Sequence, residues 1–378
     1  MANNVIGILD FHNAPSLGEV TDSRTVGSTS FLGRYAFMDF AMSNFTNSGI
    51  ETVGVLIKEH PRSVLKHMRT MSSWVSNTKI GRSTIMYNEK GVLDPATNTD
   101  LANINENDWV IFDSNADYIV IQPTHIVCNL DLRPILNEHI ARNEKITVVT
   151  TKVKDASKEF SSSNILRVDG DGYVISTRAN DGKTEGPALV SMETWIINRT
   201  VLADMCARRV GRRSMIDEEA GIKEMIDALG KSGIFKIHTY EFKGYVRCFD
   251  SFEHFMDYSF ELFDREVFMN LFNEYWPHYT LTHDTPPALY GEDIAVNNSF
   301  ISNGAIVEGK VENSIISRDV RIGKGSTVKN CIVLSNVSIG ENCHIENMLV
   351  DKYAIITKDH VLKGDKHEYV YLRQGAIV

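Results

Sequence analysis

Residues 316–345 read ISRDVRIGKGSTVKNCIVLSNVSIGENCHI. Aliphatic residues recur in this stretch every six residues, with one step of five, at Ile316, Ile322, Val328, Val333, Ile339 and Ile345. A period near six is typical of a left-handed parallel β-helix, in which each side of each coil turns one such residue toward a stacked interior. Glycine and asparagine follow in the phrases IGKG and IGEN, where they tolerate the positive φ of tight corners. An irregular all-β domain, the alternative, leaves the period unexplained.

The N-terminal part of the chain alternates short apolar runs with helical patterns. Strand-like runs cover residues 5–9, 53–57, 118–121 and 146–150, and helical spacing covers residues 37–48 and 132–142. This βαβ order predicts an α/β fold, with a parallel sheet that is covered by helices on both faces. Ligands bind beyond the carboxyl ends of the strands in such sheets, so we expect any site in the segments after Leu9 and after Ile121.

Three segments make up the expected domain organisation. A Rossmann-like α/β domain covers residues 1–250, an aromatic-rich helix and a proline-containing linker cover residues 251–292, and the β-helix covers residues 293–378. The helix is expected over residues 252–276, and Pro277 begins the linker. A β-helix that ends in an exposed edge usually stacks on another domain or subunit, so we also expect oligomerisation.

Composition excludes several classes of partner. The chain has 378 residues, of which 43% are hydrophobic and 23% charged, as in ordinary globular proteins. Its formal net charge of −10 argues against nucleic acids and anionic membranes as partners. The 5 cysteines form no C-x-x-C pair, which favours buried thiols in a reducing compartment. No apolar stretch approaches the ~20 residues that span a bilayer, so we expect a cytoplasmic protein.

One sequence motif carries a family resemblance. Residues 31–44 read FLGRYAFMDFAMSN, and NSGI follows at residues 47–50. These motifs resemble FGGKYRIIDFALSN and NSGI of the ADP-glucose pyrophosphorylases, also called glucose-1-phosphate adenylyltransferases. The resemblance extends through the linker and the β-helix, and it implies a GT-A-like nucleotidyltransferase domain. It also implies a reaction in which ATP and glucose 1-phosphate form ADP-glucose and pyrophosphate with Mg²⁺. Asp39, within the motif, is expected to be structural rather than chemical.

The family's nucleotide loop, LAGGRGSRL, is changed in this chain. Its glycines align with Phe11, His12 and Ala14, and its catalytic arginine aligns with Ser16. Side chains here occupy the space that a phosphate needs, and positive φ becomes costly without glycine. Arg24 is the cation of this loop that remains. His12 is interpreted as filling the vacated pocket, with a new acid–base role as the alternative.

The family's metal ligands are also replaced. The family's SGDH stretch aligns with residues 122–125, so that Thr124 replaces the carboxylate, and its YWRDVGT stretch places Cys248 where the second carboxylate stands. A neutral hydroxyl and a thiol are poor ligands for a hard cation. We therefore expect no catalytic residue, no metal site and no cofactor in this chain, with Mg²⁺ needed only by a catalytic partner.

The resemblance leaves a relic pocket in place of an active site. The residues expected to line this relic nucleotide or sugar pocket are Phe11, His12, Arg24, Thr124, His125 and Arg247. Lys183 is a weak candidate for the lysine that holds the sugar phosphate in the family. Val26 stands where the family keeps a lysine tied to activator binding.

Loss of the glycine loop, the arginine and both metal carboxylates predicts an impaired catalyst, because one lost electrostatic stabiliser typically costs ~10²- to 10³-fold in rate. The pattern resembles the non-catalytic GlgD-type subunit of some bacterial ADP-glucose pyrophosphorylases. It implies a regulatory subunit in glycogen biosynthesis that joins a catalytic subunit in a hetero-oligomer, expected to be a tetramer. A sugar phosphate or a nucleotide is the effector class that the resemblance implies.

Two other functions stay open at this point. An active adenylyltransferase with a rebuilt site would need substitute carboxylates, for which Asp131 and Asp250 are candidates. A β-helix acyltransferase would need a catalytic histidine, and His344 and His360 are candidates that rest on fold analogy alone.

One basic cluster has two interpretations. It comprises Arg208, Arg209, Arg212 and Arg213. The cluster could bind an anionic effector, or it could form a solvated face that opens the next helix, which is the interpretation we favour.

Overall fold

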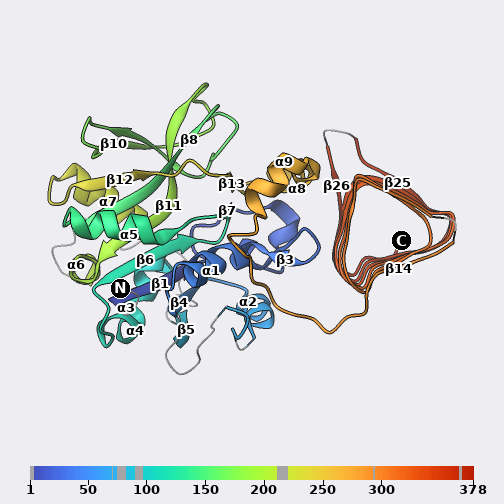
Figure 1. The fold of residues 1–378 in the computed structure, drawn as a ribbon, viewed down its shortest axis with the longest axis horizontal. Helices are drawn as coiled ribbons and strands as arrows, with labels where there is room; N and C mark the ends of the chain where they lie inside the picture. The colour runs from blue at the N-terminus through green and yellow to red at the C-terminus, as the bar shows by residue number, and fades with distance from the viewer. Residues whose placement is uncertain are drawn as a thin grey trace.

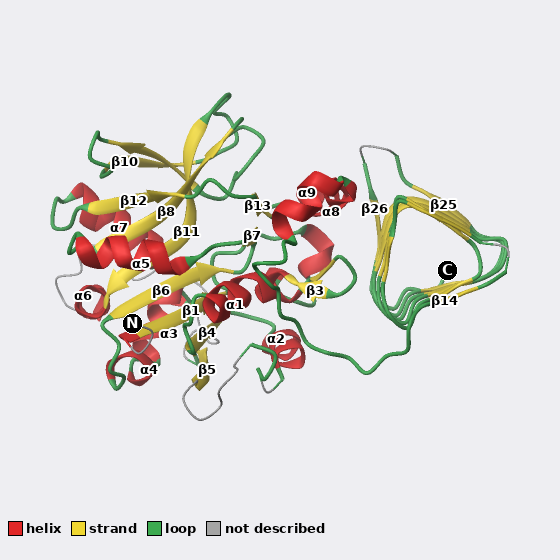
Figure 2. Ribbon diagram, in the orientation of Figure 1, coloured by secondary structure: helices red, strands yellow, loops and turns green. Residues whose placement is uncertain are grey.

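The chain folds into an α/β body and a triangular β-helix beside it (Figure 1). The computed structural model describes residues 4–69, 71–74, 82–89, 97–210, 220–292, 294–365 and 368–378. Figure 2 shows helices on both faces of the sheet of the α/β body and strands along the sides of the β-helix. The expected fold class, α/β followed by a parallel β-helix, is confirmed.

The α/β body is built on a nine-stranded sheet, with the order β5-β4-β1-β6-β11-β8-β12 and with β9 and β10 beside β11. The strands are β1 (Val5–Asp10), β4 (Thr52–Ile57), β5 (Arg82–Tyr87), β6 (Tyr118–Pro123), β8 (Ile146–Val153), β9 (Asn164–Val168), β10 (Val174–Ala179), β11 (Ala188–Asn198) and β12 (Ile237–Glu241). The sheet is mixed rather than wholly parallel, because β11 runs antiparallel to β6 and to β8. Between β8 and β11 the described residues form the antiparallel pair β9–β10 and no helix, whereas parallel pairing of β11 with β8 would require a crossover connection.

Each face of the sheet packs against its own helices. One face carries α1 (Phe37–Asn47), α2 (Pro61–Met68) and α5 (Leu132–Ala141). The other carries α3 (Asp100–Glu106), α4 (Trp109–Phe112), α6 (Arg199–Val210) and α7 (Ile222–Lys231). Asp39 is fully buried and accepts a hydrogen bond from the Ala36 backbone N–H at 2.9 Å, which caps α1. This is the structural role that the sequence predicts for Asp39.

The helical segment before the linker is broken, although the sequence pattern predicts one helix over residues 252–276. It forms α8 (Phe252–Phe260), the 3-10 turn η6 (Glu261–Phe263) and α9 (Arg265–Leu271). Asp264 has extended backbone angles, and its carboxylate accepts hydrogen bonds from the N–H groups of Glu266 and Val267. Asp264 therefore ends the first helical run and caps the second.

Short elements complete the α/β body. They are η2 (Gly18–Thr21), η3 (Val26–Ser28), β2 (Ser30–Phe31), β3 (Tyr35–Ala36), β7 (Ile126–Cys128) and β13 (Val246–Cys248). β2 pairs with β3, and β7 pairs with β13. Among the described residues, no helix is long and apolar enough to cross a membrane. All 5 cysteines are buried and free, as the sequence predicts.

The β-helix stacks parallel strands on three sides. One side is formed by β14 (Leu289–Tyr290), β17 (Ile306–Val307), β20 (Arg321–Ile322), β22 (Ser338–Ile339) and β24 (Ile355–Ile356). The other two sides are formed by β15 (Ala295–Asn297), β16 (Phe300–Ile301), β18 (Lys310–Glu312), β19 (Ile315–Ile316), β21 (Thr327–Val333), β23 (His344–Val350), β25 (Val361–Lys363) and β26 (Val370–Leu372). The first strand, β14, lies within the segment that the sequence analysis assigned to the linker.

The regularly spaced aliphatic residues lie inside the β-helix, as the sequence predicts. All six residues of the period, from Ile316 to Ile345, are buried in one core cluster inside the β-helix. The positive φ values of Gly325 (+74°) and Asn342 (+56°) confirm the corners expected from the IGKG and IGEN phrases. The period is therefore the local cause of this fold.

A third core cluster joins the two bodies. Aromatic residues of the α/β body, among them Phe37, Phe249 and Phe255, belong to the same cluster as outward-facing residues of the β-helix, such as Ile332 and Leu349. The helices α8 and α9 lie between the bodies and contribute to this cluster (Figure 1). The α/β body and the β-helix thus share one apolar interface.

A buried ion pair crosses the same boundary. The guanidinium of Arg24 donates to Asp351 at 2.6 Å and to the Gln374 side chain at 2.9 Å. Tyr371 donates its hydroxyl hydrogen to the same Asp351 oxygen at 2.6 Å. Arg24 is 4% exposed and Asp351 is fully buried, so the attraction between them is poorly screened by water.

We expect Asp351→Asn to destabilise the chain by about 3–5 kcal/mol, because it leaves the buried Arg24 charge without a carboxylate. Urea unfolding measures this free energy. The matched control is Asp181→Asn, whose partner Lys183 lies 3.1 Å away in an exposed pair; we expect a change within ~0.5 kcal/mol there. Equal losses in the two variants would contradict a structural role for the Arg24–Asp351 pair.

Candidate functional site

The loop after β1 lies at the carboxyl end of the sheet, where a ligand would be expected. Phe11 is 3% exposed and belongs to the core of the α/β body. A Cβ atom on Gly27 would lie 2.5 Å from the Phe11 ring and 2.7 Å from Thr124, so these three residues are in close contact. The Phe11 ring therefore takes up the space beside Gly27 and Thr124 at this edge of the sheet.

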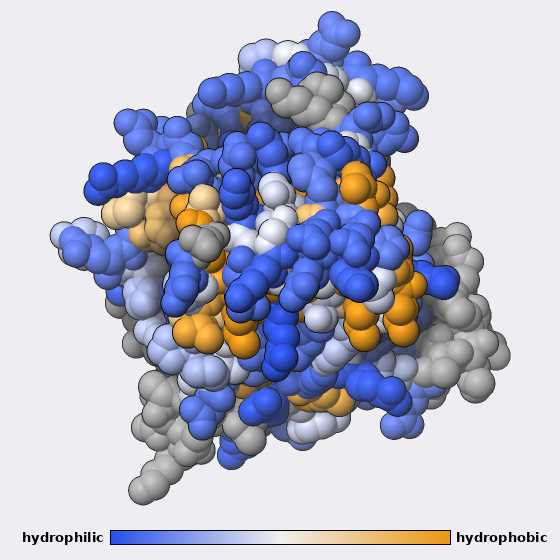
Figure 3. All heavy atoms as spheres, turned by 90° about the vertical axis from the view of Figure 1, so that its right-hand side faces the viewer, coloured by the Kyte–Doolittle hydropathy of each residue, from blue (hydrophilic) through white to orange (hydrophobic). Residues whose placement is uncertain are grey.

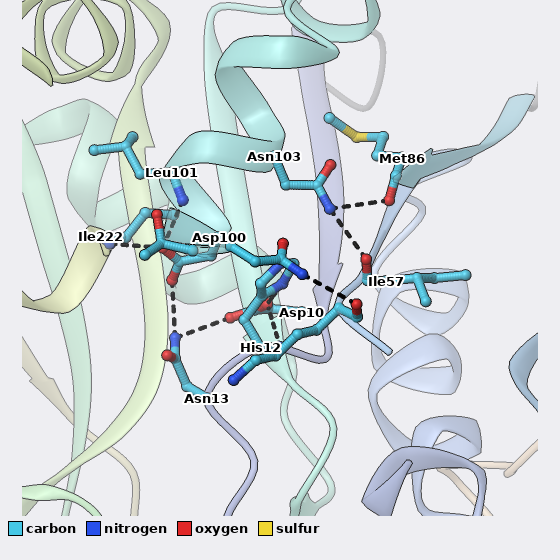
Figure 4. A network of polar contacts seen from close by, with 12 residues as sticks. Asp10, His12, Asn13, Ile57, Met86, Asp100, Leu101, Asn103 and Ile222 are labelled. Atoms are coloured by element: carbon cyan, nitrogen blue, oxygen red, sulfur yellow. Dashed lines mark hydrogen bonds and ion pairs between the residues drawn. The ribbon is translucent and has the colours of Figure 1, made fainter. Parts of the chain in front are cut away.

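The polar groups of this loop bond to one another (Figure 4). His12 is buried, its Nδ1 lies 3.0 Å from Asp10 Oδ1, and its backbone N–H donates to the same oxygen. The Asn13 amide donates to Asp10 at 3.1 Å and to Asp100 at 2.8 Å. Asp100 in turn accepts from the backbone N–H of Ile222, at the start of α7. His12 is thus buried at this edge of the sheet and held by a carboxylate.

Asp100 is the deepest member of this network. Burial, together with the nearby charge of Asp10, raises the pKa of Asp100 to about 6. The sequence analysis did not single out Asn13 or Asp100. Their sequence separation of 87 residues leaves no local pattern by which to find the contact.

Little space remains at this edge of the sheet. The cavity lined by Asp10, Asn13, Glu193 and Lys223 encloses about 10 Å³. That is about the space of one water molecule. The space that these residues enclose is therefore too small for a nucleotide.

Thr124 and His125, after β6, are fully buried. His125 Nε2 lies 3.7 Å from Glu193 Oε2, and burial lowers the pKa of His125, so the ring is neutral at pH 7. The other Glu193 oxygen accepts from Lys223 at 3.2 Å. Glu193 and Lys223, which the sequence analysis missed, thus neutralise each other's charge beside His125.

Cys248, on β13, is buried, and burial raises the pKa of its thiol well above the usual value. Asp250 accepts two hydrogen bonds from Ser161, from the backbone N–H and from the hydroxyl, both at 2.8 Å. It also contacts His254 Nδ1. Burial raises the pKa of Asp250, but the hydrogen bond and charge of His254 and the two bonds from Ser161 together outweigh burial and hold that pKa below its usual range. This carboxylate is therefore bound within the chain.

The second carboxylate proposed for a rebuilt site is held elsewhere. Asp131 caps α5 and forms an exposed pair with Arg133, whose guanidinium nitrogens lie 2.8 Å from its oxygens. Among the described residues, no group of three His, Cys, Asp or Glu side chains could hold a metal ion. With Thr124 and Cys248 at the family's two metal positions, the side chains do not fit Mg²⁺.

Ser16 and Arg247 make their contacts outside the network of Asp10, Asn13 and Asp100. Ser16 is exposed, and its hydroxyl accepts from the Gly18 backbone N–H at 3.1 Å. Arg247 borders a hollow of about 950 Å³. Its guanidinium makes two bonds to Glu261, at 2.8 and 3.0 Å, and it lies over the Tyr258 ring. The charge of Arg247 is thus paired within the chain.

Several other candidates from the sequence lie outside any shared site. Lys183 is exposed and pairs with Asp181 at 3.1 Å. Arg208 pairs with Asp204 at 2.7 Å. The side chain of Arg209 and residues 212 and 213 lie outside the described part of the chain.

The two β-helix histidines make local contacts. His344 Nε2 lies 3.4 Å from Glu346 Oε2, and His360 Nδ1 lies 3.0 Å from the Lys358 backbone oxygen. These contacts place neither ring in a shared catalytic arrangement.

A second hollow, of about 810 Å³, lies between α2, the β2–β3 turn and the β-helix. We call it the basic pocket. Its basic lining residues are Arg24, Arg34, His60, Arg62, Lys66, His67, Arg69, His283, Arg318 and Lys352. Among the described residues that line it, Asp319 is the only acidic one.

The charges of the basic pocket repel one another. Burial and the nearby charges of Arg24 and Lys66 lower the pKa of Lys352 to about 8. Burial and the charge of Arg34 likewise lower the pKa of Arg318. The pocket is therefore a positively charged concave surface that an anion would neutralise.

The structure thus corrects the placement of Arg24. The sequence analysis assigned this residue to the relic nucleotide pocket with Phe11 and His12. Arg24 instead lines the basic pocket and pairs with Asp351 of the β-helix. Sequence order could not reveal this partner, because 327 residues separate the two side chains.

Two family models match the chain: nucleotidyl transferase over residues 17–160, and GlmU-like C-terminal hexapeptide over residues 288–374. A glycogen biosynthesis protein GlgD from Bacillus subtilis is 29% identical, covering 99% of this chain and 97% of that protein. A second GlgD, from Geobacillus stearothermophilus, is 28% identical over 100% of this chain. A glucose-1-phosphate adenylyltransferase from Thermosipho africanus is 30% identical, covering 87% of this chain and 78% of that protein. With this coverage of both domains, the chain belongs to the ADP-glucose pyrophosphorylase (glucose-1-phosphate adenylyltransferase) family.

Proposed function

We propose that the chain is a regulatory, catalytically impaired subunit of ADP-glucose pyrophosphorylase in bacterial glycogen biosynthesis. The observation that carries this proposal is the cavity of about 10 Å³ at the carboxyl ends of β1 and β6. The two relatives named GlgD, which align over nearly the whole chain, support the assignment to glycogen biosynthesis.

The chemistry of the family requires what this site lacks. Displacement at the α-phosphorus of ATP depends on positioning and on cations that neutralise the developing charge. Arg24, the remaining cation of the loop, is held by Asp351, and the two metal positions carry a hydroxyl and a neutral thiol. No step of the reaction can be assigned to these side chains. Nucleotide and Mg²⁺ accordingly belong to the catalytic partner.

The partner in this proposal is a catalytic subunit of the same family, in a hetero-oligomer that we expect to be a tetramer. Figure 3 looks onto the β-helix and shows hydrophobic side chains between hydrophilic ones on that face. Exposed large hydrophobic residues of the β-helix include Leu289 (62% exposed), Val361 (65%) and Ile377 (73%). Exposed apolar side chains of this kind favour a contact with a second subunit.

The effector in this proposal is a sugar phosphate or a nucleotide that binds the basic pocket. Phosphate groups accept charge-assisted hydrogen bonds from guanidinium and ammonium groups, and many such groups line this pocket. The pocket has walls from both bodies, for example Arg34 from the α/β body and Arg318 from the β-helix. A ligand held by both walls would bias the arrangement of the two bodies, and docking would transmit that bias to the catalytic subunit.

Mixing the chain with its catalytic paralogue should give a complex of both subunits with changed kinetics. We expect the substrate or effector affinity of the catalytic subunit to change by about 5- to 150-fold, the range of a typical coupling free energy. Light scattering gives the mass of the complex, and pyrophosphate release gives its kinetic constants. The proposal fails if the two chains never associate or if association leaves every constant unchanged.

Phosphate-bearing ligands should stabilise the isolated chain through the basic pocket. We expect glucose 1-phosphate or ATP to raise the free energy of unfolding by about 2.7 kcal/mol at a concentration 100 times Kd. Arg318→Gln should weaken binding at least tenfold in calorimetry. The matched control, Arg321→Gln, removes an exposed arginine of β20 that does not line the pocket and should leave binding unchanged. Identical affinities in the two variants would place the ligand elsewhere.

Anion affinity should also fall as the pH rises from about 7 to 9. The pKa of Lys352 is lowered to about 8, so its ammonium, which faces Arg24, Asp351 and Lys66, loses its proton in this range. Titration calorimetry with ATP at both pH values measures the change. Lys352→Arg keeps its charge and should remove most of the pH dependence. A pH dependence that is the same in both proteins would exclude Lys352 as its cause.

A further inference from the structure

A third hollow of the molecule has a different chemistry. It encloses about 530 Å³ between the segment of α8 and η6 and one corner of the β-helix. The β-helix contributes Asn298, Asn313, Asn330 and Asn347, and the rest of the lining comprises Glu253, Asp257, Phe260, Phe263 and Tyr369. We call it the asparagine groove. It shares no lining residue with the basic pocket or with the closed cavity of the relic site.

The four asparagines form a ladder along the corner of the β-helix. Each has a positive φ, between 45° and 54°. Each also comes directly after a strand residue that pairs with the equivalent strand of a neighbouring coil. Asn298 Nδ2 donates to Asn313 Oδ1 at 2.7 Å, and Asn330 Nδ2 donates to Asn347 Oδ1 at 3.0 Å. The ladder is therefore two bonded pairs.

The ladder is interrupted between these two pairs. Among the described residues, neither Asn313 Nδ2 nor Asn330 Oδ1 has a hydrogen-bond partner, and both side chains are only partly buried. A donor and an acceptor are thus left free on neighbouring coils, in the middle of the groove. A hydroxyl group, which both accepts and donates, matches such a pair.

Aromatic rings lie across the groove from the amides. Phe260 and Phe263 are stacked, with ring centroids 5.8 Å apart, and Tyr369 lies 6.0 Å from Phe260. All three residues are half-buried, so part of each ring is accessible. A ligand with one apolar face and one face of hydroxyl groups would contact the rings and the amides at once.

The charge of the groove restricts the ligand further. Its described lining residues include two exposed carboxylates, Glu253 and Asp257, and no Lys, Arg or His. Carboxylates repel phosphates and accept hydrogen bonds from hydroxyl groups. The lining therefore disfavours sugar phosphates and nucleotides and favours neutral hydroxylated molecules.

We propose that the asparagine groove binds a neutral oligosaccharide. Three coil steps from Asn298 to Asn347, at a strand spacing of ~4.8 Å each, give a length of ~14 Å, enough for a few sugar units. The C–H face of one sugar ring packs against the accessible part of the Phe260 ring, and its hydroxyl groups bond to Asn313 and Asn330. This site goes beyond the regulatory role proposed above and does not depend on it.

Calorimetry of the full chain with maltotetraose and with cellotetraose tests the proposal. We expect millimolar binding of at least one of the two. The double variant N313G/N330G removes both amides, and glycine accepts the positive φ at each position; we expect at least a tenfold loss of affinity. The matched control is N342G, at a different corner with φ +56°, which should bind as the unchanged chain does.

Three outcomes overturn the proposal. The first is absence of binding of both saccharides at millimolar concentration. The second is equal affinity in N313G/N330G and N342G when both variants melt at the temperature of the unchanged chain. The third is binding of spermine that neither saccharide displaces, since that result would assign the two carboxylates and the aromatic rings to a cationic ligand.

Discussion

The contact of the Phe11 ring with the bare backbone of Gly27 and with Thr124 is the constraint on which the carboxyl edge of the sheet depends. The ring is packed into the core at this edge, and the polar groups of the loop after β1 bond to Asp10 and to Asp100. Gly27 lies three residues after Arg24, in the turn η3. The segment between β1 and β2 therefore carries both the contact with Phe11 and the ion pair with the β-helix.

The relic site and the basic pocket differ in how far the charges of their side chains are paired within the chain. At the relic site, Asp10, Glu193 and Asp250 each have a partner within the chain, and about 10 Å³ of space remains. In the basic pocket, burial and the facing positive charges of Arg24 and Lys66 lower the pKa of Lys352. In the proposed function, a chain with an impaired site of its own and a positively charged pocket between two bodies is suited to bind an effector and transmit its effect.

The sequence predicts features whose cause is local. The period of six places its six aliphatic residues, from Ile316 to Ile345, in the β-helix core, and the βαβ order predicts the layered α/β body. The losses at the relic site could be inferred because the loop aligns with the family without a gap. The pairing of Arg24 with Asp351, the Asn13–Asp100 bond and the antiparallel β11 could not, because each depends on residues that only the tertiary fold brings together.

Pyrophosphate release by the purified chain alone, with ATP, glucose 1-phosphate and Mg²⁺ at high protein concentration, tests the closed site most directly. The account predicts no turnover above background, since the cavity beside β1 and β6 encloses only about 10 Å³ and the two metal positions carry Thr124 and Cys248. Clear turnover that Asp250→Ala abolishes would contradict it, because that result would show a rebuilt active site in place of a closed one.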